Sequence, residues 1–148
     1  MEKVYKIANL YVATLRAIYF IHQNNHWTTK GSTFYGDHLL FERLYDASKG
    51  DADMAAEKMI GLFGEKALDF ELQNSFMNKI VSKYAGLDGN PAKMSLTIVK
   101  DFLQLSESVY KTIEDEGSMT LGLDDMIMAI ASKNEESCYL LQQTLDSE

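Results

Sequence analysis

Residues 24–59 read NNHWTTKGSTFYGDHLLFERLYDASKGDADMAAEKM, and this stretch decides the fold. No proline occurs from Thr33 to Gly61, and apolar residues recur there at three- and four-residue steps, which predicts one long helix. At ~3.6 residues per turn, one stripe of this helix carries an imidazole and three carboxylates. The four residues are His38, Glu42, Asp53 and Glu57.

The length of this helix prevents the four side chains from meeting in one chain. His38 and Glu57 are nineteen residues apart, which is roughly 28 Å along a helix, whereas metal–ligand bonds are about 2.0–2.2 Å. The stripe is nevertheless symmetric. The outer residues His38 and Glu57 have the same midpoint in the sequence as the inner residues 42 and 53, and it lies between positions 47 and 48. Two copies packed antiparallel about a twofold axis at this point would form two identical sites, each built from two subunits. Small residues at 47, 48 and 50 favour a close approach.

A second imidazole is available from the preceding predicted helix, residues 2–26. His26 ends that helix and can lie beside His38 after the short connection 27–32. Two histidines and up to three carboxylates suit Fe(II), Mn(II) or Zn(II), and open coordination positions favour redox chemistry at iron. His22 lies one turn before His26, and we expect it to be a packed or hydrogen-bonded histidine rather than a further ligand.

The remainder of the chain predicts a crossover and two more long helices. Gly61 and Gly64 are expected to end the second helix. A crossover over 65–91 then contains a short helix within 66–84, which the turn-forming sequence AGLDGNP ends.

Further helices are predicted at 94–116, with Ser95 or a neighbour as cap, and at 121–145. The expected fold is all-α, a single four-helix domain over 1–148 with a long connection between its second and third helices. No Glu-x-x-His occurs in the chain, which argues against a di-iron centre inside the bundle and favours the interface site.

The pattern of these residues resembles the Dps family of mini-ferritins, the DNA-binding proteins from starved cells. The matching positions are His26-Trp27, Lys30-Gly31, Phe34, His38, Asp53 and Glu57. The sequence LDDMIMAIASKNEESCYLLQQTL is similar to the last helix of the family, so the resemblance covers most of the chain apart from the crossover. It implies a ferritin-like four-helix subunit, a hollow homo-oligomeric shell of twelve subunits built from twofold dimers, and a ferroxidase site at the dimer interface.

The resemblance also implies which residues form that site. His26, His38 and Glu42 of one subunit and Asp53 and Glu57 of its neighbour are the expected metal ligands and catalytic residues. Many family members carry Asp in place of Glu42, which leaves open whether this carboxylate binds directly or through water. The implied metal is iron (Fe2+/Fe3+), with Zn or Mn as substitutes. Hydrogen peroxide is the preferred oxidant of many members, with oxygen as the alternative, and the ferric product is stored as a mineral.

Two other functions are compatible with the same residues. A non-enzymatic cage or dimer could hold a structural Zn(II), or only interface salt bridges, and it would show no redox turnover. Direct protection of DNA is weakened by the net charge of −8 and the pI of about 4.8. The N-terminal region offers only Lys3 and Lys6, and the chain ends in Asp146-Ser147-Glu148, so we expect weak DNA binding or none.

Several single features have two readings. Trp27 suits an interface anchor or, by the resemblance, an electron donor beside the ferroxidase site. Cys138 is expected to be a small core residue. An acidic group could be a solvated surface or the lining of threefold pores that attract Fe(II). It comprises Glu114, Asp115, Glu116, Asp124 and Asp125.

The chain has no apolar run of the ~20 residues that a membrane span needs, and its start lacks the features of a signal peptide, which predicts a cytoplasmic protein.

Overall fold

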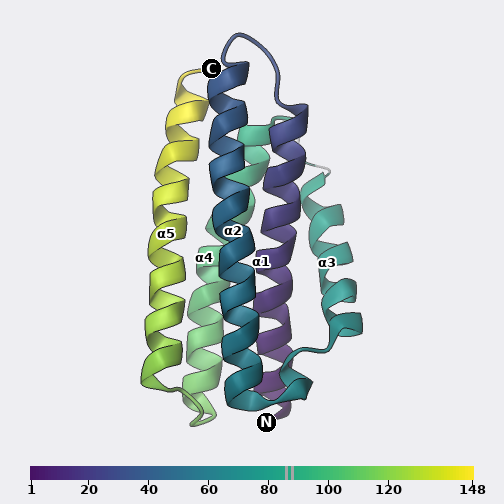
Figure 1. Ribbon diagram of the computed structural model, residues 1–148, viewed down its shortest axis with the longest axis vertical. Coiled ribbons are helices and arrows are strands. Elements are labelled where there is room, and N and C mark those ends of the chain that lie inside the picture. Colours follow the sequence, from purple (N-terminus) through teal and green to yellow (C-terminus); the bar gives the residue numbers. More distant parts are fainter. Residues whose placement is uncertain (86, 88) are drawn as a thin grey trace.

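The computed structural model describes residues 1–85, 87 and 89–148, and every regular element within these ranges is helical. The elements are α1 (Glu2–Thr28), α2 (Phe34–Phe63), η1 (Glu65–Ala67), α3 (Phe70–Ala85), α4 (Pro91–Asp115) and α5 (Leu121–Asp146). Figure 1 shows α1, α2, α4 and α5 side by side as a bundle, with α3 outside it along α1. The predicted all-α bundle is confirmed. None of the described helices is long and apolar enough to cross a membrane.

The connection between α2 and α4 sets the topology of the bundle. These two helices run in the same direction (Figure 1), so the chain must return along the bundle before α4 begins. The 3-10 turn η1 and the helix α3 make this return, in agreement with the predicted crossover that contains a short helix. The short helix ends at Ala85. Residues 86 and 88 of the turn predicted after it lie outside the described residues.

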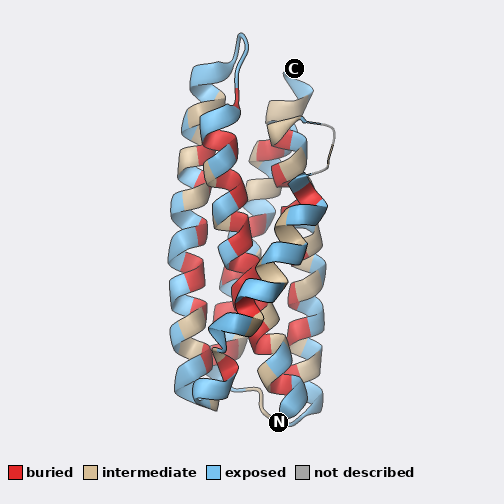
Figure 2. Cartoon of the chain, turned by 90° about the vertical axis from the view of Figure 1, so that its right-hand side faces the viewer, coloured by how far each residue is buried: buried red, intermediate tan, exposed pale blue. Residues whose placement is uncertain are grey.

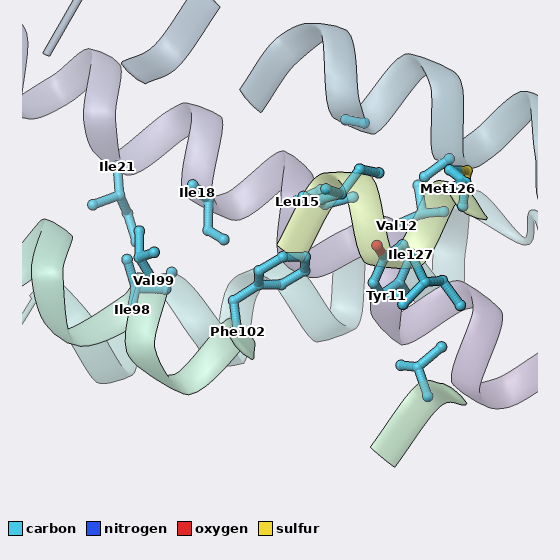
Figure 3. Packing of buried hydrophobic residues seen from close by; sticks show 14 of the residues in the cluster. Tyr11, Val12, Leu15, Ile18, Ile21, Ile98, Val99, Phe102, Met126 and Ile127 are labelled. Atoms are coloured by element: carbon cyan, nitrogen blue, oxygen red, sulfur yellow. The ribbon is translucent and has the colours of Figure 1, made fainter. Parts of the chain in front are cut away.

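The core is organised around α1. Figure 2 shows buried residues gathered on the inward faces of the helices. In Figure 3, Val12, Leu15 and Ile18 of α1 lie among residues of α4 and α5, and the rings of Tyr11 and Phe102 are 5.5 Å apart. Burial of each such apolar side chain contributes about 1.5–3 kcal/mol, so this face of α1 holds much of the bundle together.

A buried asparagine fixes the crossover against α1. The Asn9 side chain donates a hydrogen bond to the Lys66 carbonyl (3.0 Å) and accepts one from the Asp69 backbone N–H (2.8 Å). It also accepts from the Gln73 side chain (3.2 Å), which in turn accepts from Arg16 (3.0 Å). Because these bonds satisfy backbone groups at the start of the crossover, they determine where α3 lies on α1.

The predicted start of α4 was wrong. The helix begins at Pro91, whose fixed φ suits a first helical position, and Asn90 caps it by accepting a hydrogen bond from the Lys93 N–H (3.1 Å). Ser95 is therefore not a cap but a fully buried residue one turn into the helix.

The predicted end of the first helix was also too early. The helix α1 continues to Thr28, so Trp27 is helical rather than part of the connection. Of the two glycines expected to end the second helix, Gly61 lies within α2, whereas Gly64 ends it as predicted: the helix stops at Phe63 and Gly64 turns the chain with a positive φ of 84°.

One charged pair joins α2 to α5 at the edge of the core. The Asp51 carboxylate is only 4% exposed and pairs with the Lys133 ammonium, whose side chain is half exposed. A carboxylate buried to this degree is stable only while a cation or hydrogen-bond donor faces it.

We therefore expect Lys133→Ala to lower the free energy of unfolding by about 3 kcal/mol, because it leaves the Asp51 charge buried without a partner. Urea unfolding followed by circular dichroism measures the change. The matched control is Lys111→Ala, which breaks the exposed pair with Asp115 and should cost about 0.5 kcal/mol or less. Equal losses in the two variants would contradict the prediction.

Candidate metal centre

Two histidines form a reciprocal contact where α1 ends and α2 begins. The Nδ1 atom of His26 is 2.7 Å from the His38 carbonyl oxygen, and the Nδ1 atom of His38 is 2.7 Å from the His26 carbonyl oxygen. Their rings are stacked with centroids 3.7 Å apart and planes 16° from parallel. The pairing of these two residues that the sequence predicted is therefore present within one chain.

This contact determines which ring nitrogen is available to a metal. A carbonyl oxygen can only accept a hydrogen bond, so Nδ1 of each histidine carries the proton. The remaining ring nitrogen of each histidine, Nε2, has no hydrogen-bond partner in the described part of the chain and is the atom left to bind a metal. Metal-binding histidines commonly donate their other N–H to a backbone carbonyl in this way, which orients the ring and fixes its tautomer. The two imidazoles therefore fit a metal-binding role.

Aromatic residues flank the histidine pair on both sides. The Phe34 ring stacks on His38 with centroids 5.1 Å apart, and the Tyr45 ring meets His26 edge-on at 5.3 Å. Partial burial of the phenol raises the pKa of Tyr45, and the charges of Glu42 and Asp46 add to the effect, so the phenol keeps its proton at neutral pH. The sequence analysis missed Tyr45; its position seven residues after His38, two helical turns on, was the available signal.

The three carboxylates lie along α2 as the helical spacing requires. Glu42 is partly buried and one turn from His38, whereas Asp53 and Glu57 are exposed on the far half of the helix. None of the three forms a hydrogen bond or an ion pair within residues 1–85, 87 and 89–148. Over the same residues, no group of three or more His, Cys, Asp or Glu side chains is close enough to hold a metal ion. A single chain therefore brings His26 and His38 together but leaves Asp53 and Glu57 apart from them.

The stripe of α2 that carries these carboxylates also exposes large apolar side chains. Tyr35 is 70% exposed, Leu39 44% and Ile60 40%. Tyr35 and Ile60 are equally distant from the midpoint between Ala47 and Ser48, as are Leu39 and Ala56. An antiparallel copy of α2 would thus set apolar residues opposite apolar residues while setting His38 opposite Glu57. Clustered exposed apolar residues are typical of a surface that a partner covers.

The small residues expected at the helix crossing do not all face the stripe. Ser48 is buried, its hydroxyl donates to the Leu44 carbonyl, and together with Ala47 it lines a groove beside α5. Gly50 instead borders a groove with Asp53, between α1, α2 and α3. The expectation was wrong for Ser48, which is buried within its own bundle. Ala47 and Gly50 are exposed, and their place at a helix crossing stays a prediction.

His22 has the packed role that the sequence analysis favoured. It is buried, and its Nδ1 atom is 2.8 Å from the Ser95 hydroxyl, which also accepts a hydrogen bond from Asn25 (2.8 Å). The Asn25 side chain donates as well to the Pro91 carbonyl (3.0 Å). Burial lowers the pKa of His22 to about 3, so the ring is neutral. These bonds tie the end of α1 to the start of α4 and thereby position the neighbouring His26.

The other singled-out residues form no hydrogen bond or ring contact with the histidine pair in the described part of the chain. Trp27 is 65% exposed, and its ring makes no aromatic contact in the described part of the chain. Cys138 is half-buried against the core, and burial raises its pKa. In the acidic group, Asp124 accepts a hydrogen bond from Tyr110 (3.0 Å), while the other four carboxylates are exposed.

Known proteins resemble this chain along nearly its whole length. General stress protein 20U of Bacillus subtilis (strain 168) is 28% identical, over 97% of this chain and 98% of the relative. DNA protection during starvation protein 2 of Bacillus anthracis is 23% identical, over 98% of each chain. The X-ray structure of Dps from Thermosynechococcus elongatus matches with a TM-score of 0.78 at 17% identity, over 97% of this chain and 90% of that one. No family model matches the chain. The ferritin-like fold and the resemblance predicted from the sequence are confirmed.

The buried His22 makes stability depend on pH. The unfolded chain protonates this histidine below about pH 6.5, whereas the folded chain does so only near its pKa of about 3. The unfolded state therefore binds more protons between these values, and stability falls as the pH decreases from 6.5. The His22→Gln variant has no such titration. Between pH 7 and pH 5 we therefore expect its free energy of unfolding to fall by roughly 2 kcal/mol less than that of the wild type. Urea unfolding at the two pH values tests this, and parallel losses in both proteins would contradict it.

Proposed function

We propose that two copies of this Dps-like chain pack antiparallel along α2 and form ferroxidase sites that oxidise Fe(II). In each site, His26 and His38 of one subunit would face Asp53 and Glu57 of the other. The observation that carries the proposal is the reciprocal histidine contact, which leaves Nε2 of both rings free at one end of α2, while the unpaired Asp53 and Glu57 are exposed on its far half. The coverage of nearly the whole chain by the curated relatives supports it.

The donor set suits iron as the substrate. Neutral imidazoles and carboxylates together bind Fe(II), and the negative carboxylates stabilise the higher charge of Fe(III) after oxidation. With hydrogen peroxide, two Fe(II) ions each lose one electron, and the peroxide takes up both electrons and two protons to form two water molecules. Glu42 lies one turn from His38 and binds either directly or through water. Zn(II) and Mn(II) fit the same donors as substitutes, and oxygen is the alternative oxidant.

The remaining expectations about assembly follow from the same proposal. A twofold dimer is the minimum that completes a site, and a shell of twelve subunits that stores ferric mineral in the cytoplasm is the larger assembly we propose. Of the acidic group, Glu114, Asp115, Glu116 and Asp125 are exposed, so these four are the candidates to line an entry pore for Fe(II).

The second candidate function is a non-enzymatic cage or dimer with a structural Zn(II) at this interface. The same free Nε2 atoms and carboxylates favour it, because they would bind Zn(II) equally well. The two functions differ in one measurable property, since a structural site retains metal without oxidising Fe(II).

The first test measures Fe(II) oxidation by absorbance, under hydrogen peroxide and separately under oxygen. We expect His38→Ala and Asp53→Ala each to reduce the rate to background, because each removes one half of the site. Co-expression of the two variants should restore about a quarter of the wild-type activity, since half of the randomly formed dimers carry one intact site of two.

The matched control is Glu107→Ala, which removes an exposed carboxylate on α4 and should oxidise Fe(II) at the wild-type rate. Background oxidation by the wild type would overturn the ferroxidase proposal and leave the structural site. Activity that is lost in both variants but not regained on co-expression would show that the site does not span two subunits.

A further test concerns DNA, which the name of one relative mentions. Binding of a chain with a net charge of −8 would displace few counterions from the DNA phosphates. We therefore expect no band shift of linear DNA at ~150 mM salt. A gel-shift series at low and moderate salt measures this. A complex that persists at the higher salt would support the DNA-protection alternative.

A further inference from the structure

The outer face of α2 carries a regular seven-residue pattern. Its side chains follow one another at alternating steps of four and three residues, which is the spacing of the contact positions where two helices pack in a coiled coil. Each of these side chains is exposed or half-buried in the single chain. We call this set the α2 seam, and it comprises Tyr35, Leu39, Glu42, Asp46, Lys49, Asp53, Ala56 and Ile60.

The two central residues of the α2 seam carry opposite charges. Asp46 and Lys49 are equally distant from the midpoint of the seam, so in an antiparallel pair each carboxylate lies at the height of the other copy's ammonium. Both side chains are exposed, and neither forms an ion pair or a hydrogen bond in the described part of the chain. Arg16 borders the same groove but donates to Gln73 instead (3.0 Å). Both central charges therefore remain available to a second copy.

The layers beside this centre give a metal-free dimer no electrostatic attraction. Glu42 would lie opposite Asp53 of the other copy, and two facing carboxylates repel each other unless a cation lies between them. That layer belongs to the proposed metal sites, and the outermost layers of the seam pair uncharged side chains. Lys49 is the one basic residue of the seam, so its approach to Asp46 is the attraction that remains along the seam without metal.

Other arrangements of the two helices are less favourable. Parallel copies would place each residue of the seam opposite itself, so that Asp46 would meet Asp46 and Lys49 would meet Lys49. An antiparallel pair shifted by seven residues would set charged residues against apolar ones. Lys49 would lie opposite Leu39 for one direction of the shift, and Glu42 would lie opposite Ile60 for the other. Of these arrangements, only the unshifted antiparallel pair combines apolar outer layers with oppositely charged central ones.

We propose that Asp46 of each copy pairs with Lys49 of the other, and that these two symmetric ion pairs determine the register of the dimer and its choice of partner chain. The inference rests on the proposed two-subunit site and adds residues that bind no metal. A shift of register would separate His38 from Glu57 of the other copy, so the ion pairs act as positioning contacts for the site. A related chain with other charges at these two positions would meet unpaired or like charges and be disfavoured as a partner.

Charge reversal tests the proposal by sedimentation velocity without added iron, which measures the concentration at which the assembly dissociates. Asp46→Lys and Lys49→Asp each place two pairs of like charges across the twofold axis, so each should raise this concentration by on the order of 100-fold. The double variant exchanges the charges and should dissociate within about threefold of the wild-type concentration. An equimolar mixture of the two single variants should behave like the double variant, because each chain then finds opposite charges on its partner.

The matched control is Arg43→Asp, which reverses an exposed charge of α2 outside the seam, where Arg43 pairs with Glu136. This variant should associate as the wild type does, and circular dichroism verifies that all variants are folded. Wild-type association of both single variants would overturn the inference. A loss of association that neither the double variant nor the mixture reverses would overturn it as well.

Fe(II) oxidation by the wild type is measured separately and decides the proposed function. If the wild type oxidises no Fe(II) but the charge reversals show the expected rescue, the ferroxidase proposal fails and the ion pairs stand. If the wild type oxidises Fe(II) while both single variants associate normally, the ion pairs fail and the function stands. A wild type that is monomeric would overturn both the two-subunit site and the ion pairs.

Discussion

The length and continuity of α2 constrain everything that this chain can do with a metal. Because the helix is unbroken from Phe34 to Phe63, nineteen residues of helix hold His38 roughly 28 Å from Glu57. No rearrangement of side chains closes that distance, so the proposed ligands could meet only across two chains. The exposed Tyr35, Leu39 and Ile60 lie on the same stripe, so the apolar surface that a partner would cover is also the surface that carries the proposed ligands.

The histidine contact orients half of the proposed metal site within a single chain. Each ring is held by the backbone of the other histidine, so the tautomer does not depend on a side chain that could move. Behind it, the buried hydrogen bonds of His22, Asn25 and Ser95 fix the end of α1 against α4. Preorganisation of this kind reduces the conformational entropy that metal binding would otherwise cost.

Burial distinguishes the charged residues of α2 that stabilise the fold from those that are available to bind a metal. Asp51 has a cation beside it and is almost fully buried, which is a structural arrangement. Asp53 and Glu57 have no partner in the described part of the chain and are exposed. Water solvates their charges in a single chain, and both carboxylates stay available to bind a metal. Asp51 and Asp53 are two positions apart in the sequence, and their different surroundings come from the 200° rotation that this spacing gives on a helix.

The sequence by itself determined the helices, the crossover and the spacing of the five proposed ligands, because these depend on periodicity and on the fixed rise of an α-helix. It misplaced helix ends, since the capping of α4 by Asn90 competes with that by Ser95 and only packing decides between them. It also could not show that His22 is neutral, that Trp27 is exposed, or that Tyr45 contacts His26. Those properties arise between residues on different helices or from burial in the bundle, and tertiary packing alone brings such groups together.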